Sequence, residues 1–226
     1  MGGHNPGQWL GLIDAVYGIG MTLMVFNLPK TLKDIAIQYS LHPQYISNQR
    51  FDFAVHIIDY ILIFLVLYEL WCFHRTILMA SSNPPHRLHG HITALVLVIV
   101  SITPACTVFL INAEGHLLLT HAAANLSFLR LRSTAFYLLL LPALSYGLLT
   151  ILARLNAVDG DRTVLRLCRQ SAGYRCLLFT GFFLSSLMAY RYAYMWIRPD
   201  VLTLGYLALS YHQDHVLQLI NRQRRP

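Results

Sequence analysis

Charge is scarce in this sequence. Only 12% of the 226 residues are Asp, Glu, Lys or Arg, whereas a typical soluble domain carries about 25%. A soluble chain of this length could bury a large core, but it would still need a charged surface. The shortage of charge, together with 56% hydrophobic residues and a mean hydropathy of +0.50, excludes a soluble domain. It predicts an integral membrane protein.

Other features are also missing. The four cysteines, which show no metal-ligand spacing, are expected to be small apolar core residues rather than a disulfide framework. We find no nucleophile–base pair, no phosphate loop and no GxSxG elbow, so we expect neither an enzyme nor catalytic residues. The first residues lack a basic segment and a cleavage site, so we expect no signal peptide. The net charge of +7 is spread in short segments between apolar runs, which indicates membrane topology and not a nucleic-acid partner.

The apolar residues occur in long runs, as in bilayer-spanning helices. We predict an all-α fold: a polytopic membrane protein forming a single transmembrane domain over residues 1–226. Pro29 is expected to end the first helix, and the polar segment 114–132 is expected to lie at the interface before the fourth span. The six predicted transmembrane helices are about 9–28, 53–73, 92–111, 134–153, 176–197 and 201–220.

The basic residues predict the orientation. With the N-terminus inside, the inner segments hold ten Lys and Arg residues and the outer segments seven. The inner ones include compact clusters at 154–175 and 222–225. We therefore predict that both termini are cytoplasmic. The arginines of 162–175 would also suit anionic lipid headgroups.

The first predicted helix has two different faces. At 100° per residue its apolar residues form one stripe, with Thr22 at its border. Asp14 points about 140° away from Ile19, and a carboxylate in a span usually faces the interior of a bundle. Asp14 is therefore expected to contact its own subunit. The stripe residues are Leu12, Ala15, Ile19, Thr22, Leu23 and Phe26.

The segment LIDAVYGIGMTLMVFNLP, residues 12–29, resembles the first helix of the transmembrane-protein-175 family, the endosomal–lysosomal potassium channel and its prokaryotic relatives. Trp71 and His74 look like the family's Trp-x-x-His at the end of the second helix, and Pro104 with Thr107 resembles its proline-containing third helix. The residues of the first helix that match identically and in register are Asp14, Ala15, Val16, Ile19, Thr22, Leu23 and Val25.

This resemblance implies a potassium-selective channel whose first helices line the pore of a cyclic homotetramer. Ile19 would form the narrowest ring, with Leu23, Phe26 and Thr22 nearby, and Leu12 and Ala15 would also line the path. Asp14, Trp71 and His74 would form a structural polar network. The implied partners are other copies of the chain, membrane lipid and permeant K⁺, with no bound cofactor or metal, in a prokaryotic cell membrane.

The chain also departs from the family pattern. The family's Arg is Gln8, its Phe-Ser before the Asp is Leu12-Ile13, and its late Glu is Asn27. In the family those polar groups help to tie the first helix to its neighbours. Their loss puts that polar network, but not the pore stripe, in question.

Two other functions remain open. Eleven histidines are compatible with a membrane-bound haem or redox protein, although they show no facing pairs at matching depth. A proton-leak channel is the second alternative, since relatives of the family also pass protons. His56 and Asp59 could form a proton relay or a packed polar pair. His212 and His215 have a metal-ligand spacing, but a solvated helix end explains them as well.

Overall fold

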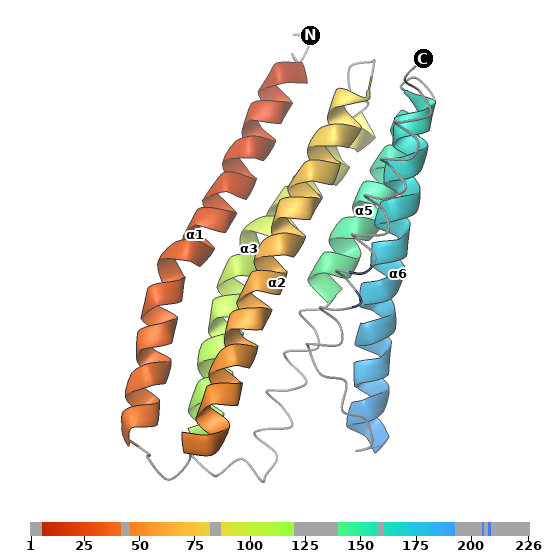
Figure 1. Ribbon diagram of the computed structural model, residues 1–226. Coiled ribbons are helices and arrows are strands. Elements are labelled where there is room, and N and C mark those ends of the chain that lie inside the picture. The colour runs from red at the N-terminus through yellow and green to blue at the C-terminus, as the bar shows by residue number, and fades with distance from the viewer. Residues whose placement is uncertain are drawn as a thin grey trace, which may run out of the picture.

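The computed structural model describes residues 6–41, 46–81, 87–119, 140–157 and 161–192, together with 205 and 208. Within these residues the structure is all-α, as predicted, and contains no strand. Consecutive helices run in alternating directions and lie side by side (Figure 1). They are α1 (Pro6–Leu41), α2 (Ile46–Met79), α3 (Arg87–Leu119), α5 (Leu140–Asn156) and α6 (Arg162–Tyr192).

The prediction that Pro29 ends the first helix is wrong. α1 continues through Pro29 to Leu41. Proline removes one backbone donor, but the flanking turns keep their own hydrogen bonds. Helices of membrane proteins tolerate such an interruption where neighbouring groups satisfy the freed backbone. Pro104 likewise lies inside α3.

The helices also extend beyond the apolar runs from which they were predicted. α6 begins at Arg162, well before the predicted start of the fifth span at Cys176. An apolar run marks only the part of a helix that needs a hydrocarbon environment, so polar turns can continue it on either side. The sixth predicted span lies outside the described residues except at positions 205 and 208, and the predicted interfacial segment lies outside them beyond Leu119.

Two of the described helices contain a segment long and apolar enough to cross a bilayer. These segments are Trp9–Phe26 in α1 and Leu88–Cys106 in α3, and the apolar helix Leu140–Asn156 is shorter. The other predicted spans stay predictions.

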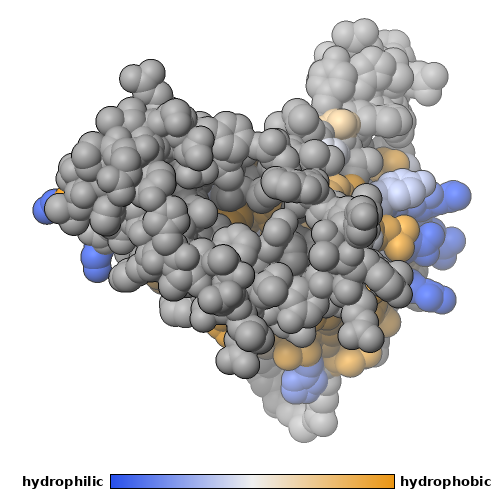
Figure 2. All heavy atoms as spheres, turned by 90° about the horizontal axis from the view of Figure 1, so that it is seen from below, coloured by the Kyte–Doolittle hydropathy of each residue, from blue (hydrophilic) through white to orange (hydrophobic). Residues whose placement is uncertain are grey.

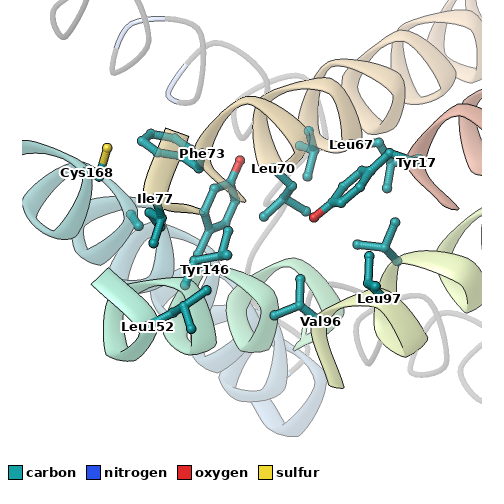
Figure 3. Close-up of a cluster of buried hydrophobic side chains, with 14 of the residues drawn as sticks. Tyr17, Leu67, Leu70, Phe73, Ile77, Val96, Leu97, Tyr146, Leu152 and Cys168 are labelled. Carbon is teal, nitrogen blue, oxygen red and sulfur yellow. The ribbon is translucent and has the colours of Figure 1, made fainter. Parts of the chain in front are cut away.

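One apolar core joins all five described helices. Tyr17 of α1, Phe73 of α2, Val96 of α3 and Tyr146 of α5 all point into it (Figure 3). Among the described residues, α1 packs only on α2 and α3, whereas α5 packs closely on α6. α1 therefore lies at one edge of the five described helices, as Figure 1 shows, and one side of it contacts none of the other four.

Candidate functional site: the two faces of the first helix

The inner face of α1 is packed tightly against α2 and α3. Ile13, Tyr17 and Met24 are at most 1% exposed. Gly20 faces α3, where an added Cβ would lie 3.7 Å from Pro104 Cγ. Ile13 stands where the family pattern has a serine, and its complete burial shows that this position is packed by an apolar side chain in this protein.

The outer face of α1 carries the whole predicted stripe. Ile19 is 61% exposed and Phe26 75%, although both are large apolar side chains. Leu12, Leu23, Ala15 and Thr22 are exposed as well. The Thr22 hydroxyl donates to the Gly18 carbonyl at 2.7 Å, so this polar group is satisfied within its own helix. A contiguous exposed apolar surface of this kind is normally covered by lipid or by another protein.

Asp14 lies on the side of α1 that faces α2. Its Oδ1 accepts a hydrogen bond of 2.7 Å from Trp71 Nε1, and its Oδ2 lies 3.7 Å from an Arg75 guanidinium nitrogen. The Arg75 guanidinium also lies over the Trp71 ring, 5.4 Å from its centroid. Trp71 and Arg75 thus each contact one oxygen of the Asp14 carboxylate. Sequence reasoning did not assign the Arg75 cation to this carboxylate.

His74 lies apart from Asp14. Its side chain is fully buried, and its Nδ1 lies 3.5 Å from the Tyr17 hydroxyl. The two rings meet edge to face with centroids 6.1 Å apart. His89 of α3 is also buried. The structure therefore brings Asp14 and Trp71 together, whereas His74 contacts α1 through Tyr17 one turn further along.

Sequence reasoning missed a buried ion pair between α2 and α6. Arg175 is only 2% exposed and forms a bidentate pair with Glu69, in which its Nε donates to Oε2 at 2.7 Å. Tyr146 of α5 donates to the same carboxylate at 2.8 Å, and Arg175 also donates to Ser171 Oγ at 2.6 Å. The guanidinium lies 5.2 Å from the centroid of the Phe73 ring. The available signal was Glu69 itself, because a carboxylate inside an apolar run needs a partner.

The described residues contain no group of three or more His, Cys, Asp or Glu side chains able to hold a metal ion, and their four cysteines are free thiols. The His212 and His215 pair lies outside the described residues. His56 and Asp59 lie on α2, but their side chains are outside what the structure describes, as is that of Gln8.

The helices are long and antiparallel, two of them contain bilayer-length apolar segments, and α1 presents an apolar face away from the other described helices; these features are consistent with an α-helical membrane protein. Residues 10–104 match the family model described as "Endosomal/lysosomal potassium channel TMEM175". This segment of the chain is therefore similar to that family, and it covers most of α1, all of α2 and the first half of α3. No curated protein and no solved structure matches the chain.

Proposed function

We propose that the protein is a potassium-selective channel and that ions pass through an apolar constriction lined by α1. The observation that carries this proposal is the outward stripe of α1 within a segment that matches a potassium-channel family. The same helix is anchored to α2 and α3 by its inner face. The anchor fixes the rotation of α1, and with it the direction in which the stripe points.

The stripe suits an apolar constriction. We assign the narrowest ring to Ile19, with Leu23 and Phe26 one and two turns further along and Thr22 beside them. Leu12 and Ala15 line the path on the other side of Ile19. An apolar ring resists wetting, so an ion must lose part of its hydration shell to pass. K⁺ holds its water less tightly than Na⁺, and the smaller penalty favours K⁺.

A ring requires several copies of the chain. α1 lies at the edge of its own bundle, so a symmetry axis beside it would bring equivalent stripes together and leave the other helices outside. We propose a cyclic homotetramer of six-helix subunits with both termini cytoplasmic. Closed cyclic symmetry would also remove the exposed apolar face from lipid.

Ion flux from proteoliposomes tests the assignment of Ile19. I19N would place a polar amide in the constriction and lower the dehydration penalty, so the K⁺/Na⁺ flux ratio should fall about tenfold, which corresponds to about 1.4 kcal/mol. V25N is the matched control: Val25 is 52% exposed but lies about 120° from Ile19 around the helix. It should leave the ratio unchanged.

The outcomes separate the proposal from its alternatives. Equal ratios for wild type, I19N and V25N would show that Ile19 is not the selectivity ring. A reversal potential that follows the pH gradient and not the K⁺ gradient would indicate a proton leak. The haem or redox alternative is not favoured by the family match, and a haem absorption band in the purified protein would reopen it.

A further inference from the structure

The first turns of α6 carry three arginines on one side of the helix. Arg162, Arg166 and Arg169 are spaced i, i+4 and i+7, so they lie within about 60° of one another around the axis. Arg162 and Arg166 are exposed and Arg169 is half-buried. None of the three forms an ion pair with any residue that the structure describes.

The fourth arginine of this segment, Arg175, lies on the opposite side of α6 from the other three. Arg175 lies about 140° from Arg162 around the axis and points inward to Glu69. One arginine thus points into the bundle and pairs with a carboxylate, whereas the other three lie on the outer side of α6. The nearby Asp161 does not neutralise them directly, because its Oδ1 caps the helix by accepting the backbone N–H groups of Thr163 and Val164.

The outer side of α6 changes from cationic to apolar along its length. Leu177 and Leu184 lie within about 60° of Arg162 around the axis and are 69% and 54% exposed. Tyr174, 62% exposed, lies between the two zones along the helix axis, although it is about 120° from Arg162 around that axis. Tyrosine is enriched where a membrane helix passes from headgroups to hydrocarbon. Figure 2 shows hydrophilic side chains beside hydrophobic ones on the side of the molecule where α6 lies.

The length of α6 agrees with that boundary. Its 31 residues span about 46 Å at 1.5 Å per residue, whereas the hydrocarbon core is about 30 Å thick and needs about 20 residues. The helix therefore exceeds the core by roughly 11 residues. The excess is accounted for by the turns from Arg162 to about Ala172, which hold all three outward arginines.

The neighbouring end of α5 adds one positive charge at the same level. The Asp161 N–H donates to the Ala80 carbonyl at 3.1 Å, so α6 begins beside the end of α2. Arg154, exposed in the last turn of α5, lies at this end of the bundle too. We propose that Arg162, Arg166 and Arg169 form a binding surface for the headgroups of anionic phospholipids, with the acyl chains lying along Leu177 and Leu184.

This proposal requires a membrane protein but not a conducting one, so it can fail or hold independently of the channel function. Anionic phospholipids complement both zones, because each supplies a phosphate for the guanidinium groups and a chain for the leucines. Each arginine near an anionic membrane surface is expected to strengthen binding about fivefold. A soluble acidic protein or a nucleic acid would leave the apolar zone uncovered.

The test is a titration of the detergent-solubilised full chain with mixed micelles containing fluorescently labelled phosphatidylglycerol. We expect R162Q/R166Q to weaken binding at least about tenfold and R162K/R166K to stay close to wild type. The matched control is K30Q/K33Q, which removes the same number of exposed charges from α1. It should weaken binding less than about twofold. If R162Q/R166Q does not keep the helix content and thermal stability of wild type, R166Q alone should lose about fivefold.

Three outcomes would overturn the proposal. The first is an equal loss in the K30Q/K33Q control, because only total charge would then matter. The second is unchanged binding in R162Q/R166Q or R166Q. The third is complete displacement of the lipid by inorganic phosphate at millimolar concentration, which would indicate a site for the free anion. Binding that resists phosphate and prefers phosphatidylglycerol to phosphatidylcholine supports the lipid surface.

Discussion

Two interfaces of the bundle each contain a carboxylate and an arginine, but in very different surroundings. Between α1 and α2, Asp14 and Arg75 have side chains 39% and 38% exposed and lie 3.7 Å apart. Between α2 and α6, Glu69 and Arg175 are 19% and 2% exposed and form two hydrogen bonds. A half-exposed pair contributes little, because nearby solvent screens it. A buried pair is strongly destabilising when one partner is lost.

The difference separates the roles of the two regions. α6 is fixed to α2 by a buried ion pair that also engages Tyr146 of α5. α1, which carries the proposed pore residues, is held by apolar packing and by the hydrogen bond from Trp71 to Asp14. We infer that α2, α5 and α6 form the rigid part of the subunit against which α1 is placed.

Breaking the buried pair is expected to have the largest effect. R175M leaves Glu69 as an uncompensated carboxylate in an apolar interface and should lower the free energy of unfolding by about 3–5 kcal/mol. The double variant E69L/R175M removes both charges and should recover most of the loss. Thermal unfolding of the purified protein in detergent measures both. Arg166 is exposed, so R166M should change stability by less than about 0.5 kcal/mol. A comparable loss in R166M would contradict the comparison.

Removing Asp14 is expected to have an intermediate effect. D14A leaves the Trp71 indole N–H without its acceptor in a half-buried site, at a cost of about 1–3 kcal/mol. Because this contact fixes the position of α1 against α2, we expect size-exclusion chromatography to show less of the proposed tetramer. The K⁺/Na⁺ ratio of the channels that still assemble should be close to wild type. Loss of selectivity with intact assembly would instead place Asp14 in the conduction path.

Neutralising Arg75 is expected to have the smallest effect. R75Q removes the longer, half-exposed contact of Asp14 and should lower stability by less than about 1 kcal/mol. The loss should shrink further at high salt, because exposed pairs are screened. Thermal unfolding at low and high ionic strength measures this. An effect as large as that of D14A, or one insensitive to salt, would show that Arg75 and not Trp71 is the main partner of Asp14.

Much of the first helix could be predicted from the sequence. Helical periodicity predicted that Ile19 and Phe26 lie on a different face of the helix from Asp14. In the structure Ile19 and Phe26 are exposed, whereas Asp14 lies at the contact between α1 and α2. That separation needs only the 100° step of a helix. Whether the exposed stripe lines a pore depends on other copies of the chain, so the pore assignment stays a prediction.

Other features could not be predicted because they depend on distant partners. The local sequence around Arg175 is rich in arginine and suggested membrane orientation and contact with anionic lipid headgroups, whereas its carboxylate partner is 106 residues away. The family resemblance implied that His74 would join Asp14 and Trp71 in one polar network. The His74 and Asp14 side chains diverge instead, and His74 meets Tyr17.

The sequence by itself determined that the protein is a set of apolar helices and which side of α1 is polar, since both follow from composition and from the fixed geometry of a single helix. Only the tertiary structure decided that α1 lies at the edge of the bundle, that Arg75 joins Asp14 and that Arg175 turns inward to Glu69. These pairings depend on the relative rotation and axial shift of packed helices. Both are set by many small contacts at once and are not encoded in any single segment.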